Sequence, residues 1–399
     1  MKISLAPDLH CYYNTYDKLD KTGESKRKKE WKNATAEFYR VCKKQKVDVA
    51  VFPGDFFVNP KPTAECVLLI SKLFREMEKI GVKVIGITGN HDITGSNRKS
   101  MNDVVSAIGD NEEWCYSKFD TLVIDDVGFG FLPFVKAPEI TAYNPDYAQM
   151  EMSEQLIQIA GGLSAKMSED TNIKKKILVG HWSIQGAITS SGKTMERTIN
   201  GVEVVLPLGE LATQGWDAIL FGHIHKPQVL HEQKPFVAYS GCIQRINIGE
   251  ANDKRGFYIY DTSDDSYVFH EFSAIEMKSF HAIISTPDDV DALLKEISES
   301  DIKDKIVQVK YDISKDNVDL VNQKLLIKAL EKKKPMNVVN ILPRILEASR
   351  QRDITLTESL DSETALKKWM SNKGIIDKEQ DKIMVLFNKY KERILEEAK

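Results

Sequence analysis

The sequence lacks any run of about 18 consecutive apolar residues, so it predicts no membrane-spanning helix. It opens directly on the apolar segment Lys2-Ile3-Ser4-Leu5, without the longer apolar stretch of a signal peptide. Cysteine is scarce and odd in number, with 5 among 399 residues, and no two cysteines stand in a Cys-x-x-Cys spacing. We therefore expect reduced thiols, as is usual in a cytoplasmic protein.

An excess of charge of one sign is also missing. The chain carries 55 Lys and Arg against 59 Asp and Glu, a formal net charge of −4, and neither end is a basic arm or an acidic tail. If the protein meets a polyanion, local groups or metal ions must attract it. A hydrophobic fraction of 42% and a charged fraction of 29% are typical of a globular protein. The length predicts two or three domains at roughly 150 residues each.

From residue 1 to about 270, short apolar runs alternate with longer amphipathic segments, a pattern typical of an α/β domain. Helices are predicted around Trp31 and Phe38 and around Ile70 and Phe74, the second with Thr63 as its N-cap. The strand-like runs are Ile3–Ala6, Val47–Phe52, Val82–Thr88, Lys176–Val179 and Ala218–Phe221.

The rest of the chain is divided by composition. The polar residues 14–30 suggest a surface insertion, and three short β-type runs between 236 and 272 suggest one antiparallel edge. A small α/β unit follows, and the segment Lys332-Lys333-Lys334-Pro335 suggests a linker to C-terminal helices. We thus expect domains at 1–272, 273–335 and 336–399.

Each of the five strand-like runs is followed within a few residues by side chains that bind metals. The clusters are Asp8-Leu9-His10, Gly54-Asp55, Gly89-Asn90-His91-Asp92, Gly180-His181 and Gly222-His223-Ile224-His225. Parallel strands bring their carboxyl ends to one edge of a sheet, where α/β proteins build their sites. Residues i and i+2 of extended backbone face the same way, so Asp8 and His10 can reach one ion, as can His223 and His225.

The donor set exceeds the needs of one ion. Its members are Asp8, His10, Asp55, Asn90, His181, His223 and His225. Asp55 is the natural bridging carboxylate, and the absence of a thiolate favours Mn, Fe, Zn or Mg. Two ions about 3.5–4 Å apart would suit an in-line displacement at phosphorus. Taken singly, Asp8 could instead cap a helix and His181 could be a core histidine.

His91 directly follows Asn90 and points elsewhere if Asn90 binds a metal. It would then be placed to protonate a leaving oxygen or to stabilise charge on a phosphoryl group. The cations near the clusters could contact phosphates, although surface solvation explains them equally well. They are Arg98, Lys99, Lys193, Arg197 and Lys226.

These motifs resemble the calcineurin-like metallophosphoesterase superfamily over roughly residues 1–230. Two further stretches resemble the SbcD-type nuclease subunits: Gly180 to Ala187, and Tyr239-Ser240-Gly241-Cys242-Ile243-Gln244-Arg245 with Gly249-Glu250 and Gly256-Phe257. The resemblance implies a four-layer metallophosphoesterase sandwich, a small α/β domain that caps DNA, and C-terminal helices that bind an SbcC-type ATPase.

The resemblance also implies roles for individual residues. One ion would be held by Asp8, His10, Asp55 and His225, the other by Asp55, Asn90, His181 and His223, with His91 as the catalytic histidine. The implied activity is that of a manganese-dependent DNA nuclease, a 3′-to-5′ exonuclease on duplex ends and an endonuclease on single strands. It would work in DNA repair and recombination as a homodimer within a heterotetramer with the ATPase.

Two alternatives stay open. One is a hydrolase of phosphomonoesters or small cyclic nucleotides on the same scaffold, and the other is a binding module that kept the fold without catalysis. At the C-terminal end, an apolar stripe of Ile383, Phe387, Tyr390 and Ile394 fits either an intramolecular core or a docking surface.

Overall fold

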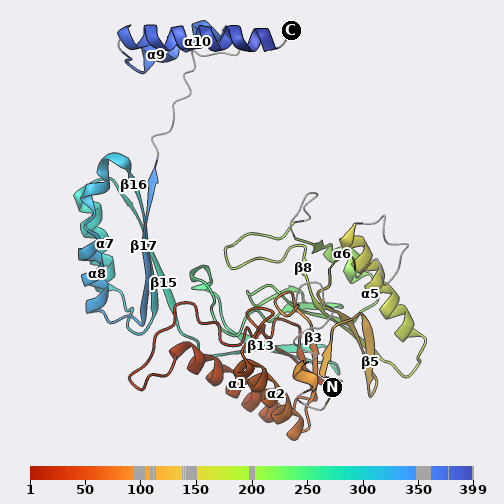
Figure 1. Cartoon of the computed structure of the whole chain (residues 1–399). Helices are drawn as coiled ribbons and strands as arrows, with labels where there is room; N and C mark the ends of the chain where they lie inside the picture. The colour runs from red at the N-terminus through yellow and green to blue at the C-terminus, as the bar shows by residue number, and fades with distance from the viewer. Residues whose placement is uncertain are drawn as a thin grey trace.

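Two β-sheets packed face to face, with helices outside them, form the larger part of the molecule (Figure 1). The computed structural model describes residues 1–93, 104–107, 111, 114–136, 138, 140, 151–196, 203–346, 361–375 and 377–397.

The first sheet has the strand order β14-β13-β1-β2-β3-β4 among these residues. Strands β1 to β4 run parallel to one another, and β13 and β14 extend the sheet in antiparallel pairing next to β1. The strands are β1 (Lys2–Leu5), β2 (Val49–Phe52), β3 (Lys83–Ile87), β4 (Cys115–Tyr116), β13 (Gly256–Asp261) and β14 (Ser266–Glu271). The predicted strands of this part are confirmed.

The second sheet has the order β11-β12-β10-β7-β6-β5, and β6, β7, β10 and β12 are parallel. Its strands are β5 (Asp120–Ile124), β6 (Val127–Leu132), β7 (Lys175–His181), β10 (Ala218–Gly222), β11 (Gln228–His231) and β12 (Phe236–Tyr239). A short pair, β8 (Ser183–Ile184) and β9 (Val205–Leu206), lies beyond it. The expectation of one antiparallel edge was wrong for β12. This strand pairs in parallel with β10 in the second sheet, whereas β13 lies in the first sheet. A short β-type run does not show in the sequence which strand it will pair with.

Alternation along the strands explains why the two sheets pack together. In β2, Val49 and Val51 lie in the core between the sheets, whereas Ala50 and Phe52 face the helices outside. Both sets are buried, as expected for strands covered on both faces. The same core between the sheets contains Ile85 from β3.

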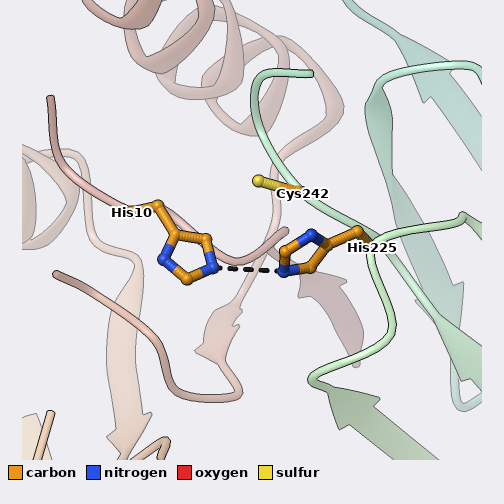
Figure 2. Close-up of side chains that lie close together, drawn as sticks. All are labelled: His10, His225 and Cys242. Atoms are coloured by element: carbon orange, nitrogen blue, oxygen red, sulfur yellow. Dashed lines mark hydrogen bonds between the residues drawn. The ribbon is translucent and has the colours of Figure 1, made fainter. Parts of the chain in front are cut away.

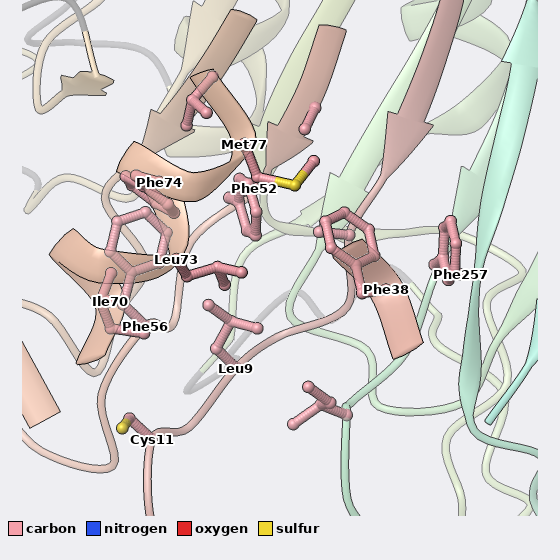
Figure 3. Close-up of a cluster of buried hydrophobic side chains, with 14 of the residues drawn as sticks. Leu9, Cys11, Phe38, Phe52, Phe56, Ile70, Leu73, Phe74, Met77 and Phe257 are labelled. Carbon is pink, nitrogen blue, oxygen red and sulfur yellow. The ribbon is translucent and has the colours of Figure 1, made fainter. Parts of the chain in front are cut away.

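The outer faces are covered by helices, which completes the predicted four-layer sandwich. Helices α1 (Lys26–Gln45) and α2 (Ala64–Lys79) cover the first sheet, and α5 (Met152–Ser168) and α6 (Leu208–Ala212) cover the second. Figure 3 shows Phe38 of α1 and Phe74 of α2 meeting Phe52. Thr63 caps α2 as predicted, its side chain accepting a hydrogen bond from the Cys66 amide.

The predicted surface insertion at residues 14–30 was wrong in its second half. Helix α1 already begins at Lys26, and both Arg27 and Glu30 are buried. The two side chains form an ion pair, and Glu30 also accepts from the Ile275 amide at 2.7 Å. Paired charges can be buried, and a composition argument does not detect the pairing.

The third unit is a parallel sheet of order β15-β16-β17 with two helices on one face. Its elements are β15 (Met277–Ile284), α7 (Pro287–Glu299), β16 (Ile306–Ser314), η4 (Lys315–Leu320), α8 (Gln323–Lys332) and β17 (Asn337–Leu346). The helical prediction for residues 337–346 was wrong. The β-branched residues Val338, Val339 and Ile341 favour a strand, and Pro343 is tolerated because β17 is an edge strand.

This third unit, which we call the cap, is seated on loops of the sandwich. Met277, Ile306 and Met336 form a buried cluster against Tyr16 and Ile248. The Asn337 side chain adds a hydrogen bond to the Tyr16 carbonyl at 3.0 Å.

The last described elements are α9 (Ser362–Asn372) and α10 (Asp377–Glu397), drawn in blue near the C-terminus of the chain in Figure 1. Asp361 caps α9 by accepting from the amides of Glu363 and Thr364. Among the described residues we find no helix that is both long and apolar enough to cross a bilayer.

Candidate metal centre

The seven predicted ligands and His91 converge at one edge of the sandwich, but not at the edge of a single sheet as we predicted. The loops after β1, β2 and β3 come from the first sheet, and the ends of β7 and β10 come from the second. The sheets are parallel in these regions and stacked, so all five carboxyl ends meet. A hydrogen bond from His181 Nδ1 to the Pro53 carbonyl at 2.6 Å joins the two sheets here.

Unusual backbone conformations bring the ligands close. Positive φ angles occur at His10 (35°), Asp55 (51°) and His223 (94°), which non-glycine residues rarely adopt. Gly89 is required by packing, because a Cβ there would lie 2.2 Å from Asp55 Oδ1. Strain of this kind is retained where the surrounding structure holds the chain, which here is around the ligand cluster.

The first group consists of Asp8, His10, Asp55 and His225, whose ligand atoms all lie within 4.8 Å of one another. His10 Nε2 stands 3.2 Å from His225 Nε2 and 3.5 Å from Asp55 Oδ2. Asp8 Oδ2 accepts a hydrogen bond from the His223 amide at 3.0 Å. The first three side chains are buried, and His225 is partly exposed.

The second group consists of Asn90, His181 and His223, with Asp55 shared between the groups. Asn90 Oδ1 lies 3.0 Å from His181 Nε2 and 3.1 Å from His223 Nδ1. Asp55 Oδ1 lies 3.3 Å from the same His181 nitrogen. One carboxylate thus faces His10 with one oxygen and His181 with the other, as a bridging ligand requires.

The outer ring nitrogens decide where the histidine protons lie. His10 Nδ1 is 3.2 Å from the Phe57 carbonyl, and His181 Nδ1 contacts the Pro53 carbonyl. Since a carbonyl only accepts, both Nδ1 atoms donate, and each ring in its neutral form then has the lone pair on Nε2. The Nε2 atom of His10 faces Nε2 of His225, and that of His181 faces the oxygens of Asn90 and Asp55.

A divalent cation could bind the imidazole nitrogens and the oxygens that face one another here. The state of one further atom also fits a bound cation. Asp8 Oδ1 is buried and has no hydrogen-bond partner among the described residues. The oxygen and imidazole donors match the preferences of Mn, Fe, Zn and Mg. The residues present therefore fit divalent metal ions.

Burial and the neighbouring charged groups shift the pKa values of the clustered side chains. Burial raises the pKa of Asp8 to about 7, and burial lowers the pKa of His10 to about 3. For Asp55, burial alone would raise the pKa, but His181, His10 and His91 hold it below its usual value. For His181, burial would lower the pKa, but Asp55 raises it to about 9.

His91 is anchored beside the first group without joining it. Its amide donates to Asp55 Oδ1 at 2.9 Å, and its Nδ1 donates to the Val58 carbonyl at 2.9 Å. The His91 ring centre lies 5.0 Å from that of His10. Its Nε2 is therefore the ring nitrogen left for chemistry.

Sequence reasoning missed several residues of the centre. Asp92 is buried and accepts from the amides of Gly89 and Phe57, which fixes the loop that carries Asn90 and His91. Glu250 and Glu203 contact His225 and His223. Asp92 stands in the same sequence cluster as Asn90, and Glu250 stands in the Gly249-Glu250 part of the stretch that resembles the SbcD-type subunits. Glu203 gave no signal in the sequence.

Cys242 also lies beside this group, within 4.8 Å of the ligand nitrogens of His10 and His225 (Figure 2). Cys242 is buried, as are Cys11, Cys42 and Cys66, while Cys115 is partly exposed, and none of the five cysteines is in a disulfide. This agrees with the expectation of reduced thiols.

Two of the cations that could contact phosphate lie among the described residues. Lys193 is exposed and Lys226 is half-buried. Arg98, Lys99 and Arg197 lie outside the described residues.

A sandwich of two mixed sheets with a carboxylate and imidazole centre at one edge defines a metal-dependent hydrolase of phosphate esters. Residues 1–227, more than half of the chain, match the calcineurin-like phosphoesterase family. The chain belongs to this family.

Individual relatives are more distant. The chain is 26% identical over 241 residues to the SbcD component of the nuclease SbcCD from Staphylococcus epidermidis, covering 59% of this chain and 61% of that protein. It is 22% identical over 253 residues to "DNA double-strand break repair protein Mre11" of Methanopyrus kandleri, covering 58% of this chain and 48% of that protein. The match thus spans about half to three fifths of the length of these curated relatives.

Among solved structures, a dimetal phosphatase from Danio rerio is similar with a TM-score of 0.41 and 11% identity, covering 68% of this chain and 95% of that chain.

Proposed function

We propose that this protein is a two-metal DNA nuclease that works as one component of a larger assembly. In this proposal Asp8, His10, Asp55 and His225 hold one ion. The second ion is held by Asp55, Asn90, His181 and His223. The single observation that supports this most is the convergence of all seven side chains from two sheets, with the two oxygens of Asp55 facing different histidines.

When bound, two divalent ions, which we propose to be Mn²⁺, lower the pKa of water toward 7 and offset the charge of a phosphodiester. The protein's own groups orient the reaction. His91, held through Nδ1 by the Val58 carbonyl, presents Nε2 to pass a proton to the departing sugar oxygen. Asp92 and Gly89 keep this loop against Asp55, so His91 and the shared carboxylate move as one unit.

DNA is the substrate that best fits the relatives and the cap. Two of the matched relatives are named for a nuclease and for DNA double-strand break repair. The cap contacts Tyr16, in the loop after β1 that also carries Asp8 and His10, and Ile248, two residues before Glu250. We propose exonuclease activity, 3′ to 5′, on duplex ends and endonuclease activity on single strands.

One experiment separates this function from its rival. The full chain is incubated with Mn²⁺ and circular single-stranded DNA, linear duplex DNA or a chromogenic phosphomonoester, beside His91→Ala. We expect DNA cleavage that falls by about 10²–10⁴-fold in the variant, the usual contribution of a general acid. Hydrolysis of the phosphomonoester alone would reject the nuclease in favour of a monoesterase, and full DNA cleavage by His91→Ala would remove His91 from the mechanism.

We further propose that α9 and α10 bind an SbcC-type ATPase, in an assembly that contains two copies of this chain. Exposed apolar side chains on these helices include Trp369, Leu386 and Tyr390, exposed by 43%, 54% and 60%. A chain that ends at residue 360 keeps β17 and therefore the whole cap sheet. It should bind Mn²⁺ and cleave DNA but fail to co-purify with the ATPase, and retained association would refute the assignment.

A further inference from the structure

We propose that Glu250 and Glu203, which are outside the ligand set, are positioning residues that each control a different metal ion. Each carboxylate contacts one of the two histidines His223 and His225. Glu203 contacts the Nε2 atom of His223, whereas Glu250 contacts the Nδ1 atom of His225. The inference rests on the proposed metal centre and not on the nature of the substrate.

Glu250 is buried and held from several sides. Its Oε1 lies 3.3 Å from His225 Nδ1 and accepts from the Asn247 side chain at 2.8 Å. Its Oε2 accepts from the Ile246 amide at 3.0 Å and faces Arg255 Nη2 at 3.0 Å. A carboxylate with this many donors is fixed in place, so the ring that donates to it is fixed as well.

Arg255 closes the arrangement. Its Nη1 donates to the backbone carbonyl of His225 at 2.6 Å, while its Nη2 pairs with Glu250. The backbone and the ring of His225 are thus tied to the same ion pair. Because Nδ1 donates to Glu250, Nε2 carries the lone pair and faces His10 Nε2, in the first group.

Glu203 contacts the other ring nitrogen, Nε2, of its histidine His223. Its Oε1 accepts from His223 Nε2 at 2.8 Å, and it also accepts from the Ser183 hydroxyl. The lone pair of His223 is therefore on Nδ1, which faces Asn90 Oδ1 at 3.1 Å, in the second group. Both glutamates line one cavity of about 290 Å³ with His223 and His225.

The alternation explains how neighbouring histidines serve two ions. Residues i and i+2 of a regular strand point the same way, and His223 departs from that geometry with a φ of 94°. An outer carboxylate on Nδ1 of one ring and on Nε2 of the other then fixes two different ligand atoms. Such partners also make the imidazole a better donor, and their loss usually costs 10- to 100-fold in metal affinity.

The burial of the two glutamates predicts unequal effects. The Glu250 side chain is 1% exposed and the Glu203 side chain is 45% exposed. Water can replace part of what Glu203 provides but has no access to the position of Glu250. We expect Mn²⁺ affinity to fall by about 100-fold at one site in Glu250→Ala and by about 10-fold at the other in Glu203→Ala. The Mn²⁺ affinity of Glu250→Gln should lie between those of the wild type and Glu250→Ala, since an amide oxygen still accepts a hydrogen bond from His225 Nδ1.

The experiment measures free Mn²⁺ by electron paramagnetic resonance during titration of the metal-free full chain, with thermal unfolding as the check on folding. Asp253→Asn is the matched control for Glu250, because Asp253 lies 3.7 Å from Arg255 Nη2 but its carboxylate does not serve His225. Glu210→Gln, on α6 and seven residues after Glu203 in the chain, controls for the loss of one negative charge. Both controls should bind two ions as the wild type does.

Double-mutant cycles assign each effect to its ion. Glu250→Ala should add less than twofold once His225→Ala is present, but should keep its full effect in His223→Ala. The reverse is expected for Glu203→Ala. Equal weakening of both ions by either substitution, a Glu250 effect that persists in His225→Ala, or an effect as large in Asp253→Asn would overturn the proposal. Two-site Mn²⁺ binding without DNA cleavage would reject the nuclease and leave this inference standing.

Discussion

At the scale of single residues, the outer nitrogen of each histidine determines what the inner nitrogen can do. His10 and His181 donate to backbone carbonyls of Phe57 and Pro53, and a carbonyl cannot be protonated or removed by a side-chain substitution. His223 and His225 rely on glutamates instead, so only these two can be altered through a partner. The positive φ angles at His10, Asp55 and His223 place the rings, and close-packed glycines make room for them.

Gly89→Ala tests this close packing. The added Cβ would lie 2.2 Å from Asp55 Oδ1 and 2.3 Å from the Asp55 amide, so the shared carboxylate must move. We expect a stability loss of about 1–3 kcal/mol, as for overpacking elsewhere. Calorimetry should also find Mn²⁺ binding weakened at both sites.

The control is Gly162→Ala, in α5, where an added Cβ meets nothing within 4 Å. Alanine in a helix interior should raise the free energy of unfolding by roughly 0.5–1 kcal/mol. Unchanged Mn²⁺ binding by Gly89→Ala would contradict the role given to this glycine.

At the scale of elements, the helices of the first layer hold the loops that carry ligands. Phe74 of α2 packs against Phe52 at the end of β2 and against Phe56, the residue after Asp55, with ring centres 4.7 and 5.5 Å away. Aromatic pairs of this kind contribute beyond the area that they bury. The position of Asp55 thus depends on a helix with no ligand of its own.

Phe74→Ala should lower the free energy of unfolding by about 3–5 kcal/mol, the usual result of truncating a fully buried aromatic side chain. Urea denaturation followed by circular dichroism measures the change. Leu68→Ala on the same helix is the comparison, because Leu68 is 54% exposed and should change stability by less than about 0.5 kcal/mol. A similar loss in both variants would contradict the packing role given to Phe74, because alanine has a higher helix propensity than either residue and Leu68 is exposed.

Across the molecule, the centre lies where the two sheets of the sandwich meet. Ligands of the second group come from both sheets, with Asn90 after β3 and His181 at the end of β7. An ion held by these residues, as proposed, would link the two layers in the folded chain and would be lost on unfolding. Ligand binding of this kind adds to global stability.

Mn²⁺ at about 100 times its dissociation constant should therefore raise the free energy of unfolding by about 2.7 kcal/mol for each ion. Thermal unfolding with and without a chelator measures the effect. Asp55→Asn, which removes the carboxylate facing both His10 and His181, should lose most of the gain. Full Mn²⁺ stabilisation of this variant would show that Asp55 does not bridge two ions.

The amino-acid sequence alone was enough to predict the strand runs, the two helices of the first layer, the N-cap at Thr63 and the seven side chains that cluster. These depend on local periodicity and on residue chemistry, which the order of letters contains. It also placed His91 beside Asn90.

The pairing of the strands and the contacts between distant residues could be read from the fold but not from the sequence pattern. In the fold, β12 belongs to the second sheet and residues 337–346 form a strand of the cap. Arg27 and Glu30 form a buried ion pair. The fold also brings Glu203 and Glu250 to His223 and His225. Pairing partners and outer carboxylates are matters of long-range contact, for which a single sequence carries no periodic signal.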